Sequence, residues 1–150
     1  MDMGGCTDTV VARMDATDED PETAAVRAAN TAFYAAFEAR DLDAMSDVWE
    51  HTDRVTCVHP GWPILSGWAS VAASWFALFD GPQRLQFIVT DEQVNVEGAT
   101  AWVTCNENLI DGGGTQAVAA TNVFVADEGR WHLVHHHGSP VVQQARARNS

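Results

Sequence analysis

Hydropathy alternates with a period of two through residues 84–138, which read RLQFIVTDEQVNVEGATAWVTCNENLIDGGGTQAVAATNVFVADEGRWHLVHHHG. Acid-glycine turn signals divide this stretch into four strand-like segments, at about 84–97, 99–110, 115–127 and 130–138. Connections this short make neighbouring strands antiparallel. The later part of the chain is therefore predicted to form a four-stranded antiparallel meander.

The residues before the meander have helical spacing. Asp20-Pro21-Glu22 combines an N-cap, a proline at the first helical position and an acid in the first turn, and it begins a helix to about residue 40. Two shorter helices are expected, one at residues 42–49 with Asp41 as its N-cap and one at residues 67–79, on either side of a strand at residues 54–59. Helices followed by a meander indicate an α+β fold, with the helices on one face of the sheet.

Length and charge exclude several functional classes. A chain of 150 residues is enough for one core, and its formal net charge of −13 disfavours nucleic acid and anionic membranes as partners. All eight basic residues are Arg, which excludes chemistry that needs a Lys amine. No apolar run approaches the ~20 residues of a membrane span, and the acidic start lacks the basic, apolar pattern of a signal peptide, so a cytoplasmic location is expected.

The acids concentrate at the N-terminus. Residues 1–22 carry seven acids against one Arg and have no sustained apolar period. We therefore expect an acidic disordered tail at residues 1–21, a folded domain at residues 22–141, and a C-terminal tail at residues 142–150.

The cysteines do not form a known framework. Cys6, Cys57 and Cys105 are odd in number and widely spaced, which argues against disulfides and zinc knuckles. Cys57 and Cys105 sit in apolar, strand-like runs and are expected to be buried free thiols.

Strand parity predicts which side chains face the helices. Along residues 101–109 the odd positions are the more apolar, so Glu107 is expected to point into an apolar layer. If the odd positions of the last strand also face inward, His135 and His137 enter the same layer. The opposite face keeps apolar area, including Trp102, and the simplest cover for it is a second copy of the chain. A homodimer packed sheet to sheet is therefore expected.

Several stretches together resemble a known family. They are the opening helix around Asn30–Tyr34, the run Cys57-Val58-His59-Pro60-Gly61-Trp62, the helix containing Trp75, and the ending Trp131–Ser139. Over roughly residues 22–141 the chain resembles the SnoaL-like branch of the nuclear-transport-factor-2-like superfamily. The resemblance implies a cone-shaped curved antiparallel sheet, mixed at the edge and closed by about three N-terminal helices around an internal apolar pocket. It also implies a dimer through the sheet.

The resemblance leaves the chemistry open, because the fold hosts dehydratases, isomerases and polyketide cyclases beside transport and oligomerisation modules. One hypothesis is a cofactor-free acid–base lyase or isomerase acting on a small apolar molecule. Glu107 and His137 would be the acid and base, and His59 would orient one of them or the substrate. The alternative is a non-catalytic ligand-binding or oligomerisation module, in which Glu107 is hydrogen-bonded to its neighbours and only closes the core.

Further residues are candidates for contact with the ligand. Trp62, in the loop before the third helix, is the best placed of the aromatic residues to contact an apolar ring. The other candidates are Phe33, Tyr34, Asn122 and His135. A zinc site built from the histidines and Glu107 is a further hypothesis, but the spacing of these residues supports it weakly. No metal and no cofactor are therefore expected.

Overall fold

The structure is a computed structural model that describes residues 19–82, 84–110 and 115–142. Its helices are α3 (Pro21–Ala39), α4 (Leu42–Val48) and α5 (Trp68–Asp80). Its strands are β1 (Thr56–Val58), β2 (Leu65–Ser66), β3 (Gln86–Glu97), β4 (Thr100–Ile110), β5 (Thr115–Asp127) and β6 (Arg130–Pro140). Most of the two expected tails, Cys6 and the predicted glycine turn at 111–114 lie outside the described residues.

Both N-terminal helices begin at the predicted caps. The Asp20 carboxylate accepts a 2.7 Å hydrogen bond from the Thr23 amide at the start of α3. The Asp41 carboxylate accepts one of 3.0 Å from the Ala44 amide at the start of α4. Between the helices, Arg40 takes a left-handed conformation with φ of 56°, which ends α3 and turns the chain into α4.

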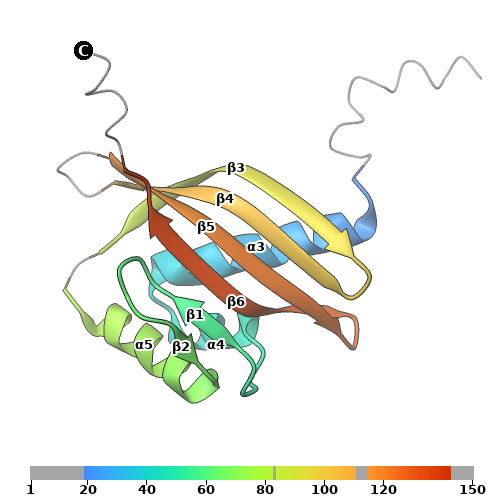
Figure 1. Ribbon diagram of the computed structural model, residues 1–150, viewed down its shortest axis with the longest axis horizontal. Helices are drawn as coiled ribbons and strands as arrows, with labels where there is room; N and C mark the ends of the chain where they lie inside the picture. The colour runs from blue at the N-terminus through green and yellow to red at the C-terminus, as the bar shows by residue number, and fades with distance from the viewer. Residues whose placement is uncertain (1–18, 83, 111–114, 143–150) are drawn as a thin grey trace, which may run out of the picture.

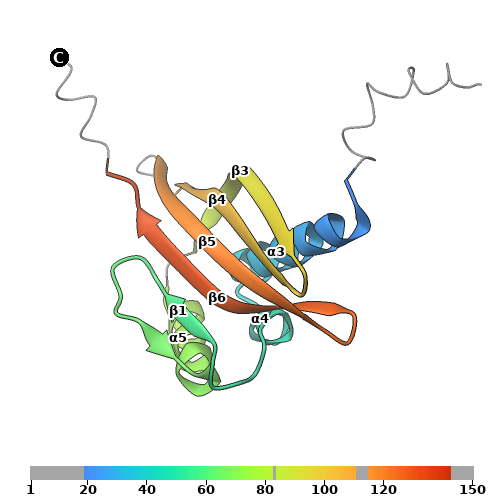
Figure 2. The same ribbon diagram turned by 45° about the vertical axis from the view of Figure 1, so that its right-hand side comes forward.

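The sheet has the order β2-β1-β6-β5-β4-β3. Strands β3 to β6 form the predicted antiparallel meander, and β1 pairs with β6 in parallel. The edge strand β2 was not predicted, because two residues are too few for alternation to be visible. Figures 1 and 2 show α3 lying across one face of the meander. Helix α5 packs beside β1 and β2, and α4 packs against α3, α5 and β6. The fold is the expected α+β arrangement of a curved sheet, mixed at the edge, with helices on one face.

Two β-bulges change which side chains of the meander face the helices. In β3 the register shifts between Thr90 and Gln93, where Asp91 has φ of 58°. In β6 one extra residue, Val134, lies between the partners of Val123 and Phe124. A bulge moves all following side chains to the other face of the strand. The bulge in β3 therefore turns Glu92 toward α3, and the bulge in β6 turns His136 inward.

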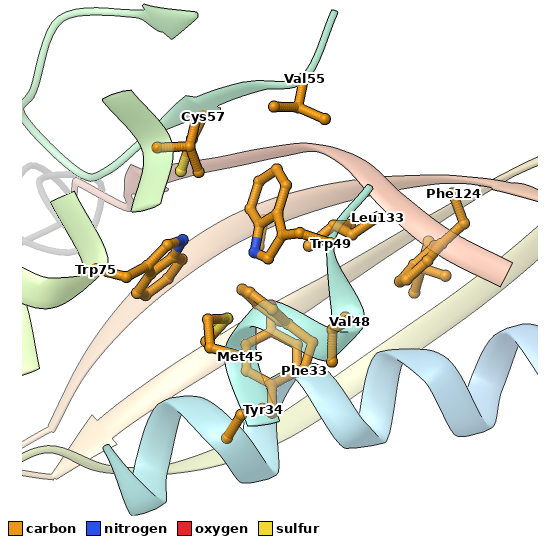
Figure 3. Close-up of a cluster of buried hydrophobic side chains, with 14 of the residues drawn as sticks. Phe33, Tyr34, Met45, Val48, Trp49, Val55, Cys57, Trp75, Phe124 and Leu133 are labelled. Carbon is orange, nitrogen blue, oxygen red and sulfur yellow. The ribbon is translucent and has the colours of Figure 1, made fainter. Parts of the chain in front are cut away.

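The core lies between α3 and the inner face of the sheet, and its largest side chains come from every part of the fold. Figure 3 shows Phe33 of α3, Met45 of α4, Trp49, Trp75 of α5, Phe124 of β5 and Leu133 of β6 in this cluster. Phe33 and Trp75 meet edge to face, with ring centroids 5.7 Å apart. Aromatic packing of this kind holds the helices against the sheet and gives the neighbouring polar side chains a rigid wall.

The face of the sheet away from the helices keeps apolar side chains in contact with solvent. Ile88 of β3 is 57% exposed, and Trp102 and Ile110 of β4 are also exposed. None of the helices that the structure describes combines the length and apolar character needed to cross a lipid bilayer.

Candidate functional site

A cavity of about 380 Å³ opens between α3, α5, the loop after β1 and the inner face of the sheet. Most of its wall is apolar, formed by Phe37, Pro60, Trp62, Leu78, Phe79, Leu85, Leu109 and Val118. Four side chains bring charge or hydrogen-bonding groups to it: Arg40, His59, Glu107 and His136. A mostly apolar cavity with a few convergent polar groups is the usual form of a small-molecule site.

Glu107 is the carboxyl group of the cavity wall. It lies on the inward-facing side of β4, as its odd position predicts, and only 4% of it is exposed. Burial raises its pKa to about 7, because the charged form loses its hydration, and the hydrogen bond from Tyr34 acts in the opposite direction. Glu107 therefore titrates near neutral pH.

Tyr34 binds Glu107 from behind the cavity. It projects from α3, and its hydroxyl donates a 2.6 Å hydrogen bond to Glu107 Oε2. Burial and the neighbouring carboxylate raise the Tyr34 pKa far above its usual value, so the phenol keeps its proton. Tyr34 does not line this cavity; it contributes to a second one, of about 220 Å³, between α3 and β3.

His136 is the histidine that β6 brings to the cavity. Its ring is buried, with Nε2 4.0 Å from Glu107 Oε2 and Nδ1 2.6 Å from Asn122 Oδ1. Burial, and to a smaller extent the nearby histidines, lower its pKa to about 3, so the ring is neutral at pH 7. His136 and Glu107 thus form a close pair that opens onto the cavity.

The predicted inward orientation of His135 and His137 is wrong. His137 is exposed, and His135 contacts Thr56 Oγ1 through its Nδ1 at 2.6 Å. The physical reason is the bulge at Val134: up to Leu133 the odd positions of β6 face inward, and beyond the bulge the even ones do. His137 consequently cannot pair with Glu107, and His136 occupies that place.

His59 lies at the end of β1 and also lines the cavity. Its Nε2 lies 2.9 Å from Ser74 Oγ, and the Ser74 hydroxyl donates to the Val71 carbonyl at 2.7 Å. Because that hydroxyl proton is already used, His59 Nε2 carries a proton and donates to Ser74. Burial lowers the His59 pKa to about 4, which makes this ring neutral as well.

The remaining predicted ligand contacts divide into two groups. Trp62 lines the cavity, is 38% exposed and packs edge to face on His59 with centroids 4.8 Å apart. Phe33 and Asn122 are fully buried and do not line the cavity; both contact His136 instead. Trp62 is thus in position to touch a ligand, whereas Phe33 and Asn122 hold the histidine.

Arg40 was missed by the sequence analysis and lines the cavity beside α5. Its guanidinium donates to the carbonyl oxygens of Phe79 and Gly81, the latter at 2.7 Å. It thereby ties the C-terminal end of α5, which carries the negative end of the helix dipole, to the end of α3.

A chain of polar contacts behind the cavity was also missed. Asn122 Nδ2 donates to Asn30 Oδ1 at 2.8 Å, and Asn30 Nδ2 donates to Glu92 Oε2 at 2.7 Å. Glu92 in turn accepts a 2.6 Å hydrogen bond from Arg27. The sequence does hold a signal for the inward orientation of Glu92. The apolar residues before it, Phe87 and Val89, are at odd positions and those after it, Val94 and Val96, at even ones, so a bulge must separate the two pairs.

Among the residues that the structure describes, the thiols and metal-ligating side chains add no site. Cys57 and Cys105 are buried free thiols, as predicted, and burial raises their pKa values to about 12 and about 11. Both are therefore poor nucleophiles at neutral pH. Within residues 19–82, 84–110 and 115–142, no three His, Cys, Asp or Glu side chains are grouped to hold a metal ion.

Comparison with known proteins agrees with this architecture. Residues 26–143 match the model of the SnoaL-like domain family, and the chain belongs to this family. It is similar to a structure from Streptomyces avermitilis described as a "putative dehydratase from the NTF2-like family", at 43% identity and a TM-score of 0.74. That match covers 81% of this chain and 96% of the other.

Other relatives carry different descriptions. A structure from Thiobacillus denitrificans, described as a "putative calcium/calmodulin-dependent protein kinase type II association domain", is 38% identical with a TM-score of 0.73. The match covers 77% of this chain and 94% of that one. The F-box protein SKIP8 of Arabidopsis thaliana is 37% identical over 118 residues, 78% of this chain. The chain spans about half the length of that curated relative.

Proposed function

We propose that the cavity binds a small, largely apolar molecule and that Glu107 moves a proton on it without a cofactor, as in a lyase or isomerase of the dehydratase class. The observation that carries this proposal is a buried carboxyl group, with a pKa of about 7, on the wall of a mostly apolar cavity. A group that titrates near the working pH both accepts and returns a proton efficiently. The 43% identity to the Streptomyces structure supports the same class.

The neighbours of Glu107 suit this role. Ionised Glu107 takes a proton from a carbon beside a carbonyl group, while the Tyr34 hydroxyl bond stabilises the carboxylate between turnovers. The protonated carboxyl then returns the proton, either to another carbon in an isomerisation or to a departing hydroxyl in a dehydration. His136 and His59, both neutral, line the same cavity without adding a competing positive charge. Trp62 packs against the apolar part of the bound molecule.

The proposal is tested with 2-tetralone, an apolar ketone whose protons beside the carbonyl are exchangeable. The rate at which wild-type protein exchanges them for deuterium is followed by proton NMR in D₂O. We expect exchange above the buffer rate, its loss in Glu107→Gln, and no change in Glu97→Gln, which alters an exposed carboxylate at the end of β3. Exchange at the buffer rate in wild type, or an equal rate in Glu107→Gln, would contradict the catalytic role.

A second candidate function is an assembly module. The observation that favours it is the apolar outer face of β3 and β4, together with the 38% identity to a protein described as an association domain. We propose that two copies of the chain pack through this face, burying Ile88 and Trp102 at the interface. Assembly and a working cavity are compatible, because the cavity lies on the other side of the sheet.

A further inference from the structure

The chain of polar contacts from the surface to the cavity has only one possible direction. It begins at the Glu92 carboxylate, which accepts a hydrogen bond from the Arg27 guanidinium. A carboxylate only accepts, so the Asn30 amide must turn its NH₂ group toward Glu92 and its oxygen away from it. The bulge at Asp91 makes this contact possible, because it turns Glu92 toward α3.

The orientation of Asn30 also fixes the orientation of the second amide, that of Asn122. The Asn30 oxygen faces Asn122, so Asn122 presents its NH₂ group, which donates to Asn30 Oδ1 and, at 3.2 Å, to the Tyr34 oxygen. Tyr34 accepts there and directs its own proton to Glu107. Both side-chain amides are fully buried, so their hydrogen-bonding groups are shielded from bulk solvent.

This series of hydrogen bonds ends at His136. With its NH₂ group engaged, Asn122 presents its oxygen to His136 Nδ1 at 2.6 Å. An amide oxygen only accepts, so Nδ1 carries the proton of the neutral ring and Nε2 has a free lone pair. That nitrogen lies 4.0 Å from Glu107 Oε2, and both residues line the cavity.

We infer that Glu92 is a positioning residue: acting through Asn30 and Asn122, it holds His136 as the Nδ1–H tautomer, so that the cavity selects ligands that carry a hydroxyl group. This inference rests on the proposed function for the step that follows binding. A ligand hydroxyl in the cavity can donate its proton to His136 Nε2, and its oxygen then lies beside Glu107, which donates to that oxygen once it is protonated.

Such placement favours dehydration over isomerisation. Glu107 removes a proton as the carbon–hydrogen bond breaks, and the carbon–oxygen bond then breaks with its electron pair going to oxygen. That oxygen takes the proton from Glu107 and leaves as water, while the two carbons keep a double bond. Glu107 returns to its ionised form, so no oxidant, reductant or cofactor is needed.

The tautomer is measured in ligand-free protein labelled with ¹⁵N histidine, by long-range proton–nitrogen correlation. We expect His136 to be protonated at Nδ1 in wild type. In Glu92→Gln the new side-chain amide can donate to Asn30 as well as accept from it. Asn30 and Asn122 can then both reverse their amide groups, so the Nε2–H form of His136 should appear. Glu38→Gln is the matched control. Glu38 lines the 220 Å³ cavity together with Glu92, but its carboxylate is exposed and does not belong to the series of hydrogen bonds from Glu92 to His136. An Nε2–H ring in wild type, or an unchanged ring in Glu92→Gln, would overturn the inference.

Ligand selection is measured with 2-naphthol and its methyl ether, 2-methoxynaphthalene, titrated into the same labelled protein. We expect 2-naphthol to bind about tenfold more tightly and to move the His136 Nε2 signal, which is the size of effect expected for one hydrogen bond. Equal binding, or binding of neither probe, would overturn the hydroxyl selection. An Nδ1–H tautomer without deuterium exchange on 2-tetralone would instead remove only the catalytic proposal.

Discussion

The Tyr34 hydroxyl donates a hydrogen bond of 2.6 Å to the Glu107 carboxylate, joining α3 to β4 across 73 positions of the chain. Two effects on Glu107 oppose each other here. Burial in an apolar wall raises its pKa, and the bond from Tyr34 lowers it, with the balance at about 7. The pKa of this carboxyl group therefore depends first on its burial and second on a hydrogen bond from α3.

Removing that contact should raise the pKa of Glu107. In Tyr34→Phe the carboxylate loses a charge-assisted hydrogen bond, so its pKa should rise above 7 by about one unit. A pH titration of the ¹³C-labelled Glu107 carboxyl group by NMR measures this value. Thr31→Val, at an exposed position of the same helix, should leave it unchanged. An unchanged or lower pKa in Tyr34→Phe would show that the hydrogen bond does not stabilise the charged form.

Glu107 should also make the protein less stable as the pH rises. Its folded pKa, about 7, lies above its ordinary value of 4.5, so the folded state binds the extra proton between these limits. The contribution of Glu107 is thus fully present below about pH 4.5 and is lost as the pH rises through 7. Glu107→Gln keeps a neutral side chain and should gain about 3 kcal/mol relative to wild type between pH 5 and pH 8.

Urea unfolding of both proteins at the two pH values measures this difference. The buried histidines act in the opposite sense, since their lowered pKa values reduce stability as the pH falls below 6.5. They are common to both proteins, so their effect cancels in the comparison. A stability difference that does not change with pH would contradict the raised pKa of Glu107.

Trp62 should matter for ligand binding and little for folding. It is partly exposed in a loop and packs against His59 at the cavity wall, so Trp62→Ala should change the free energy of unfolding by no more than about 1 kcal/mol. The same change should weaken 2-naphthol binding about tenfold, because an aromatic contact to the ligand is lost. Calorimetric titration measures the affinity. Ile64→Ala, at an exposed position of the same loop that does not line the cavity, should leave it unaltered.

The outer face of the sheet should control assembly. Trp102→Glu places a charge in the proposed contact and should convert a dimer to a monomer in sedimentation-velocity experiments. Phe76→Glu is the control, because Phe76 is 58% exposed on α5, away from that face. A wild-type monomer at all concentrations, or a Trp102→Glu dimer, would argue against packing through the sheet.

Local patterns predicted most of the elements. The caps at Asp20 and Asp41, the three helices and the four-strand meander follow from signals within a few residues of each element. Glu107 also follows from parity, because β4 runs without a bulge along its whole inward face. The two-residue strand β2 was beyond such reasoning, since it exists only through its pairing with β1.

The candidate site was predicted only in part, and the failures have one cause. Strand parity along an uninterrupted last strand predicts His137 at the cavity, whereas the extra residue at Val134 brings His136 inward instead. The bulge in β3 likewise gives Glu92 its contact with Asn30. One extra residue reverses every later side chain, and the energy of pairing with the neighbouring strand decides where it is accommodated.

By itself, the sequence determined the α+β order of elements, the carboxyl group in an apolar layer and the exclusion of Lys-dependent chemistry, because these depend on local periodicity and composition. Only the tertiary structure decided which histidine faces Glu107, that Tyr34 reaches it from the first helix, and that a surface carboxylate is connected to both. These contacts join residues far apart in the sequence. Strand pairing and helix packing bring those residues together, and neither can be predicted from a local sequence pattern.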